Sequence, residues 1–234
     1  MRGGSVATLL VALAHPDDEV GCAGTIALHA RRGDRVVLLW LTRGGMTEAL
    51  GRLPYEEVAR RRTEHGESAA AILGAEPRFM DFQDTRVEAT VDAAYEVARV
   101  VAEVRPDAVL TWGDAWVRGP RHPDHQATGK IVRDAITLAR IGGVVAPQAP
   151  HREPAPVFTL RDEHSTLPAR VVDVSSVLEV VLELGRFYGE RVGWPESDVW
   201  LRDRLAAAGA AHGVAAAEAF DAWETPGGVG TALI

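Results

Sequence analysis

The chain has 234 residues, 47% of them apolar, which is enough to bury a substantial core within one domain. Its formal net charge is −8, so it lacks the basic surplus typical of nucleic-acid-binding proteins, and no apolar run approaches the length of a membrane span. The single cysteine, Cys22, excludes an intramolecular disulfide and a zinc site built from cysteines. These features predict a cytoplasmic protein that acts on small molecules, with no nucleic-acid partner and no membrane span.

The first half of the chain alternates between the patterns of buried strands and amphipathic helices. The runs VATLLVALA and RVVLLWLT are rich in leucine and valine, as is typical of strands in a parallel sheet. The predicted elements are, in chain order, strand 6–14, helix 24–32, strand 35–42, helix 54–74, strand 78–82, helix 89–105 and strand 107–112. This order predicts a Rossmann-like α/β fold, with a mostly parallel, twisted sheet flanked by helices.

The second half of the chain is less regular. A helix that begins near Gln126 is expected to run to about Arg140, and a proline-rich loop at 142–156 follows it. The remaining expected elements are strands near 157–160 and 170–174 and helices near 176–188 and 197–212. No internal repeat or long linker interrupts the chain. We therefore expect one domain, 1–234, with a core at about 6–140 and a C-terminal region at about 141–234.

Histidines and acidic residues gather at the ends of two predicted strands. The stretch AHPDDE ends the first strand and supplies four polar side chains: His15, Asp17, Asp18 and Glu19. The stretch HPDH follows the fourth strand and places His122 and His125 three residues apart, just before the expected helix. Ligands of open α/β sheets bind beyond the carboxyl ends of the strands, so we expect the two stretches to share one site.

This combination of side chains favours a metal ion. Imidazole and carboxylate groups suit zinc or another divalent metal, and zinc hydrolases typically use three protein ligands and keep a position for water. Carboxylates crowded at the end of a buried strand repel one another, and a bound dication offsets that cost. Taken alone, Asp17, Asp18 and Glu19 also fit a solvated turn that caps a helix, and His15 alone fits a capping or buried core histidine. The two stretches together favour the metal site.

The two motifs resemble those of a known enzyme family. AHPDDE at 14–19 and HPDH at 122–125, in that order, are similar to the motifs of the LmbE-like, or PIG-L, family of zinc-dependent N-acetylglucosaminyl deacetylases. The resemblance covers about residues 6–140 and includes LTRGG, AAILG and RPDAVLT at comparable positions. It implies a zinc cofactor, or another divalent metal, and removal of an N-acetyl group from an N-acetylglucosamine-type sugar or its conjugate. It also implies homo-oligomerisation, and a role for the C-terminal region at about 141–234 in the substrate pocket or in oligomer contacts.

The resemblance assigns roles to the motif residues. It implies that His15, Asp18 and His125 hold the metal. Asp17 would be the general base that takes a proton from the attacking water. His122 would be an electrophilic or acid partner, paired with a carboxylate from Asp124 or Asp114 if it is protonated.

Further positions carry weaker implications. By the resemblance, Asp124 would orient a histidine ligand, Asp84 would face the sugar and Arg62 would line the pocket. Glu19 is expected to bond backbone amides within the turn. His65 stands where the family usually has a glutamate, which is a departure on the same helix as Arg62.

The tryptophans and the cysteine have open assignments. Trp112 and Trp116 lie beside the HPDH motif, where they fit either a sugar-stacking surface or buried packing. The C-terminal tryptophans could close the pocket or form an oligomer contact: Trp194, Trp200 and Trp223. Cys22 is expected to be a small buried residue, because nothing nearby marks it as a reactive thiol.

Three other functions fit parts of the sequence. A different metal-dependent hydrolase, an amidase or a phosphoesterase, could recruit the further carboxylates Asp17, Asp84 and Asp114. A nucleotide-binding module is suggested by the glycines of 21–24, although the dinucleotide fingerprint is incomplete there. A non-catalytic metal-binding protein is the third. The presence of both Asp17 and His122 goes against it, since a purely structural metal site needs neither.

Overall fold

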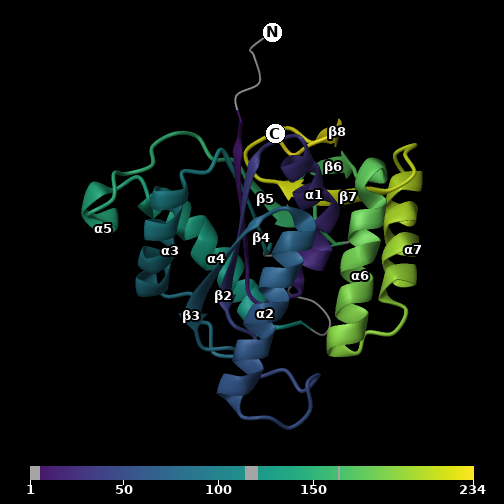
Figure 1. Ribbon diagram of the computed structural model, residues 1–234. Helices are drawn as coiled ribbons and strands as arrows, with labels where there is room; N and C mark the ends of the chain where they lie inside the picture. Colours follow the sequence, from purple (N-terminus) through teal and green to yellow (C-terminus); the bar gives the residue numbers. More distant parts are fainter. Residues whose placement is uncertain (1–5, 114–120, 163) are drawn as a thin grey trace.

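A single mixed sheet forms the centre of the molecule (Figure 1). The computed structural model describes residues 6–113, 121–162 and 164–234. Within these residues eight strands lie in the order β3-β2-β1-β4-β5-β7-β6-β8. Their bounds are β1 (Thr8–Leu13), β2 (Arg35–Thr42), β3 (Glu76–Phe82), β4 (Ala108–Thr111), β5 (Val157–Leu160), β6 (Ala169–Asp173), β7 (Ala217–Ala222) and β8 (Gly228–Gly230).

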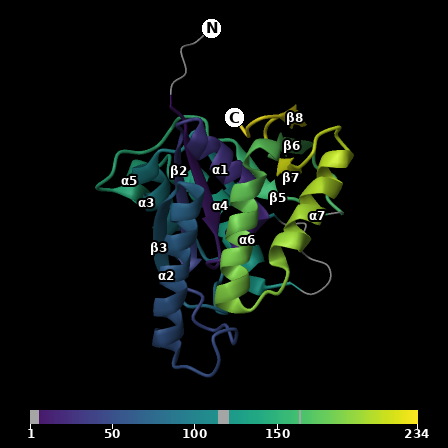
Figure 2. The same ribbon diagram turned by 45° about the vertical axis from the view of Figure 1, so that its right-hand side comes forward.

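Helices cover both faces of the sheet (Figures 1 and 2). On one face lie α1 (Ala23–Arg31), α2 (Tyr55–Leu73), α6 (Leu178–Val192) and α7 (Ser197–Ala210). On the other lie α3 (Val91–Val104), α4 (Pro123–Leu138) and α5 (Gly142–Val145). The 3₁₀ helices are η1 (Asp18–Gly21) and η2 (Ser175–Val177). The predicted single α/β domain is confirmed. Among the described residues, no helix combines the length and the apolar composition that crossing a bilayer requires.

The composition of β1 explains why helices cover both faces of the sheet. Side chains of a strand alternate between the two faces. Leu9, Val11 and Leu13 therefore pack in the core beneath α1, α2, α6 and α7, whereas Leu10 and Ala12 pack in the core beneath α3, α4 and α5. All five are 0% exposed. A strand that is buried on both faces reads as a continuous apolar run, which is the pattern of this segment.

The order of the strands creates a crevice at the end of β1. This strand pairs in parallel with β2 on one side and with β4 on the other. The chain builds the sheet outward from β1 to β3 and then returns to add β4 and β5 on the opposite side. Loops at the carboxyl ends of β1 and β4 consequently leave in different directions, and ligands bind at such a reversal point.

The second half of the chain departs from the predictions in three places. The strands β7 and β8 were not expected, because the sequence of β7, AEAFDA, is alanine-rich and that of β8 is only three residues long. The expected proline-rich loop begins with the short helix α5. Helix α4 begins at Pro123 and not near Gln126, because proline fits the first turn of a helix and His122 caps it.

Gly129 allows α4 to approach the end of β4. A side-chain carbon at this position would overlap the backbone carbonyl oxygen of Trp112, which cannot move without displacing β4. We expect Gly129→Ala to lower the free energy of unfolding by about 1–3 kcal/mol, measured by denaturant titration. The control is Gly143→Ala in α5, where nothing lies within 4 Å of the added carbon. Equal stability of the two variants would contradict this prediction.

Candidate active site

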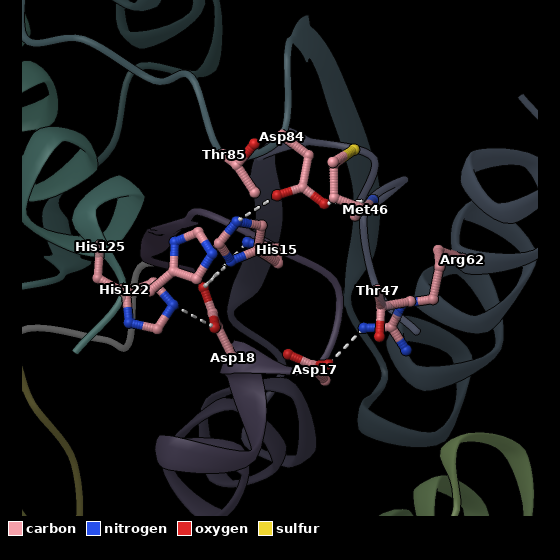
Figure 3. Close-up of a pocket in the computed structure, with 11 residues that line it drawn as sticks. His15, Asp17, Asp18, Met46, Thr47, Arg62, Asp84, Thr85, His122 and His125 are labelled. Carbon is pink, nitrogen blue, oxygen red and sulfur yellow. Dashed lines mark hydrogen bonds and ion pairs between the residues drawn. The ribbon is translucent and has the colours of Figure 1, made fainter. Parts of the chain in front are cut away.

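A pocket of about 320 Å³ opens at the carboxyl ends of the parallel strands (Figure 3). Its walls come from the segments that follow β1, β2 and β3, from the start of α4, and from α2. The lining residues are His15, Asp17, Asp18, Gly44, Met46, Thr47, Arg62, Asp84, Thr85, His122 and His125. The crevice predicted from the strand order therefore contains both sequence motifs.

His15 lies at the centre of this pocket and is surrounded by carboxylates (Figure 3). Its Nε2 atom lies 3.2 Å from Asp84 Oδ1 and 3.1 Å from Asp124 Oδ2, and its Nδ1 atom lies 3.9 Å from Asp18 Oδ2. Burial lowers the pKa of His15, but these carboxylates outweigh it and raise the pKa to about 10. The centre of the pocket therefore favours positive charge, from a proton or from a metal ion.

Asp18 is held so that one carboxylate oxygen, Oδ1, faces His125. Its Oδ2 atom accepts hydrogen bonds from the backbone N–H groups of Ala14 and His15, both at 2.9 Å, and from Trp112 Nε1 at 3.1 Å. Its Oδ1 atom lies 3.1 Å from His125 Nε2. Burial raises the pKa of Asp18, but the charges and hydrogen bonds of His125 and His15 outweigh it and lower the pKa to about 2. Asp18 is thus an ionised, oriented carboxylate.

The first turn of α4 supplies two histidines with different orientations. His122 is the N-cap residue, and its Nδ1 atom accepts a hydrogen bond from the backbone N–H of Asp124 at 3.3 Å. This bond requires an unprotonated Nδ1, so the neutral ring carries its proton on Nε2. Burial, followed by the charges of His15 and His125, lowers the pKa of His122. His125 stacks on Trp112 with ring centroids 3.8 Å apart and an interplanar angle of 8°.

The donor atoms at this corner fit a borderline divalent ion such as zinc. One ligand atom each from His15, His122 and His125 lies within 4.8 Å of the other two. A second group of the same kind consists of His15, Asp84, His122 and Asp124. Asp18 belongs to neither group, but its carboxylate contacts two histidines of the first, His15 and His125. Imidazole nitrogens and carboxylate oxygens in this arrangement are ordinary zinc ligands.

Asp17 occupies a strained position beside this group. Its φ of +116° is in the left-handed region, which residues other than glycine rarely adopt. Its carboxylate pairs with the buried guanidinium of Arg62, which also donates to the carbonyl oxygen of Pro16. Burial raises the pKa of Asp17 to about 7, with further contributions from Asp18 and Glu19 and an opposing one from Arg62. A carboxylate with a pKa near neutrality suits a general base.

The comparison with protein families agrees with this geometry. Residues 10–136, more than half of the chain, match the PIG-L family model, described as GlcNAc-PI de-N-acetylase. This chain belongs to the PIG-L family. Both motifs that line the pocket fall inside the matched residues, whereas α5 to α7 and β5 to β8 lie outside them.

Relatives of this PIG-L protein include deacetylases and a hydratase. It is 34% identical over 193 residues to the diacetylchitobiose deacetylase of Thermococcus kodakarensis, covering 80% of this chain and 69% of that protein. It is 31% identical over 140 residues to the 4-oxalmesaconate hydratase of Pseudomonas putida, covering 57% of this chain and 53% of that protein. The structure of the N,N'-diacetylchitobiose deacetylase of Pyrococcus horikoshii superimposes with a TM-score of 0.81 at 22% identity, covering 94% of this chain and 84% of that one. That structural likeness shows a shared fold.

Asp124 and Asp84 of the PIG-L protein both contact His15. Asp124 Oδ2 accepts a hydrogen bond from Thr85 N at 2.8 Å, and its Oδ1 accepts one from Val87 N at 3.2 Å. Its nearest histidine is His15, because His122 Nδ1 lies 3.9 Å away. Asp84 accepts a hydrogen bond from the backbone N–H of Met46 at 2.8 Å. The two carboxylates thus tie the ring of His15 to the loops after β2 and β3.

The sequence analysis did not predict some of the residues that line the pocket. Gly44, Met46, Thr47 and Thr85 belong to the pocket wall. They carry no metal-binding group, and their only signal is their position just after β2 and β3. Because ligands bind beyond the carboxyl ends of parallel strands, that position alone would have been sufficient reason to include them.

Other candidate residues lie away from the pocket wall. His65 faces Phe187 of α6 with ring centroids 6.0 Å apart, and burial and nearby arginines lower its pKa to about 4. Trp112 is buried with one face against His125, so it packs inside the corner. Three tryptophans do not line the pocket: Trp194, Trp200 and Trp223. Asp114 and Trp116 lie outside the described residues.

The glycine segment after β1 does not present a free phosphate site. The backbone N–H groups of Gly24 and Thr25, at the start of α1, donate to the two carboxylate oxygens of Glu218 at 2.8 Å each. A phosphate would need these same amides. Cys22, just before them, is buried, and burial followed by the charges of Glu218 and Glu19 raises the pKa of its thiol well above the usual value. The structure therefore goes against the nucleotide-binding hypothesis and supports an inert thiol.

Proposed function

We propose that this PIG-L protein is a metal-dependent N-deacetylase that removes the acetyl group of an N-acetylglucosamine-type sugar or its conjugate. The observation that carries the proposal is the meeting, in one pocket, of an oriented His/Asp cluster with Asp17, a carboxylate whose pKa lies near neutrality. The deacetylase relative that covers 80% of the chain supports this choice of reaction. A homo-oligomeric state and a cytoplasmic location remain predictions.

We assign the metal to His15, Asp18 and His125. Asp18 directs Oδ1 toward His125, while its Oδ2 atom faces His15 and accepts three hydrogen bonds; such bonds usually orient carboxylate ligands. When bound, a zinc ion lowers the pKa of its water to about 7 and polarises the acyl oxygen of the substrate. The carboxylates of Asp84 and Asp124 hold the ring of His15 from the other side.

The remaining steps belong to protein side chains. Asp17 accepts a proton from the attacking water at its carboxylate, and Arg62 keeps that carboxylate turned toward the pocket. His122, neutral and protonated on Nε2, donates a hydrogen bond to the acyl oxygen as negative charge develops there. The proton held by Asp17 then passes to the leaving nitrogen, so the products are acetate and the free amine. In this mechanism His122 needs no carboxylate partner.

Two alternatives use the same pocket. The hydratase relative indicates that the PIG-L fold also supports addition of water to a substrate. Its sequence match covers 57% of this chain, less than the 80% covered by the deacetylase. A phosphoesterase with two metals needs further ligands. Within the described residues, the two candidate ligand groups share His15 and His122. Both oxygens of Asp84 and of Asp124 already have protein partners. These two observations favour one metal over two.

A substrate screen separates these functions. Purified protein would be incubated with N-acetylated amino sugars and their conjugates, with 4-oxalmesaconate and with a phosphate monoester, each with chelator and with zinc restored. We expect primary amine and acetate from an amino sugar, loss of this release with chelator, and its recovery with zinc. A metal-containing preparation that releases no amine from any amino sugar would overturn the proposal.

A further inference from the structure

A fully buried carboxylate connects the AHPDDE corner to helix α6. Glu19 is 0% exposed and accepts three hydrogen bonds. The donors are the backbone N–H of Asp17 at 2.9 Å, Nε1 of Trp40 at 3.1 Å and the hydroxyl group of Tyr188 at 2.5 Å. Tyr188 binds Oε1, and the other two bind Oε2. Because both oxygens are engaged, the carboxylate has one fixed orientation.

Glu19 accepts a hydrogen bond from the backbone N–H of Asp17, the residue whose positive φ is strained. A positive φ at an aspartate persists only where the surrounding structure holds it. The bond from Asp17 N to Glu19 Oε2 is a fixed contact of this kind, made to a side chain that cannot move without breaking its bonds to Trp40 and Tyr188. The place of the Asp17 carboxylate in the pocket thus depends on groups behind it.

Tyr188 also contacts Arg62, which holds the side-chain carboxylate of Asp17. The guanidinium carbon of Arg62 lies 5.9 Å from the centre of the Tyr188 ring, and Arg62 pairs with the carboxylate of Asp17. Tyr188 itself is 0% exposed and does not line the pocket, so it has no route to a substrate. Its influence on the chemistry must pass through its neighbours.

We propose that Tyr188 is a positioning residue for Asp17, fixing its backbone through Glu19 and its carboxylate through Arg62. The inference rests on the proposed function, in which Asp17 is the general base. Tyr188 lies on α6, outside residues 10–136. The C-terminal region, for which the sequence suggested only substrate and oligomer contacts, thereby takes part in arranging the catalytic corner.

The substitution Tyr188→Phe tests this proposal, because it keeps the ring and removes only the hydroxyl group that binds Glu19. We expect kcat per folded, zinc-loaded molecule to fall by about 10-fold or more, while KM stays within about twofold and the zinc content is unchanged. Tyr95→Phe, on α3 at the opposite face of the sheet, is the matched control and should keep the native kcat. If the hydroxyl group of Tyr188 only stabilises the fold, less protein will fold but kcat per folded molecule will be native, and the proposal is then wrong.

A second measurement needs no turnover. Hydrogen–deuterium exchange of the backbone amides at 15 and 17–20 reports how firmly the corner is held. We expect faster exchange there in Tyr188→Phe than in the native protein and in Tyr95→Phe. If the native protein releases no amine, the proposed function fails while this measurement still tests the positioning. Unchanged exchange at the corner would overturn the positioning role by itself.

Discussion

Asp17→Asn is expected to lower kcat by about 10²–10⁴-fold while the protein keeps its zinc and its fold. Asparagine cannot accept a proton from water at neutral pH, so the variant loses the proposed general base. The replacement is otherwise mild. Asparagine tolerates a positive φ, as the corner at +116° requires, and its side-chain oxygen can still accept a hydrogen bond from Arg62.

The measurement compares kcat and zinc content in the same preparations. Asp81→Asn on β3 is the control, because its side chain is 84% exposed and pairs with Arg43 on the surface. This control should keep native kcat and native zinc. Near-native turnover by Asp17→Asn would remove Asp17 from the mechanism. Loss of zinc in that variant would instead indicate that Asp17 helps to hold the metal.

His125→Ala is expected to weaken zinc binding by about 100-fold or more and to abolish turnover at micromolar zinc. The estimate follows because even residues that only orient zinc ligands contribute 10–100-fold to affinity. The change removes an imidazole next to Asp18 and leaves a space against Trp112. Zinc content after dialysis and zinc titration of activity measure the effect. The control is His212→Ala, an exposed histidine in the turn after α7.

His122→Ala distinguishes the two possible sets of ligands. The donor atoms of His122 lie as close to His15 and His125 as a shared ligand would, yet the proposed mechanism uses His122 as a hydrogen-bond donor. We therefore expect His122→Ala to retain zinc and to lose about 10²–10³-fold in kcat. Loss of zinc equal to that of His125→Ala would place His122 among the ligands.

The sequence predicted the half of the molecule in which local patterns agree with the fold. Buried runs such as 6–14 and 35–42 predict their own strands, and the rule that ligands bind at carboxyl ends predicts that AHPDDE and HPDH share one pocket, as they do. The strand β7 was missed because its alanines pack well in either kind of element, and its place between β5 and β6 is decided by distant partners.

The same limit applies within the site. The positions of the motifs predicted which residues gather at the corner. They did not predict which groups each of these residues contacts. Asp124 turns to His15, 109 residues away, and leaves His122 to be fixed by a backbone amide. Tyr188 reaches Glu19 from 169 residues along the chain. Such contacts depend on how α4 and α6 pack, and no spacing in the sequence records that packing.

The late position of β7 along the chain has a consequence for how the protein is made. This strand fills the middle of the C-terminal half of the sheet, pairing with β5 on one side and β6 on the other, and it carries Glu218, which binds the first amides of α1. During synthesis, β1 and α1 emerge before β7, whose residues 217–222 follow six of the other strands of the sheet in the chain. Until then β5 has an unpaired edge and α1 has no partner for its first amides. The start of α1, which follows the corner that holds His15 and Asp17, consequently gains its Glu218 partner only after β7 has been synthesised.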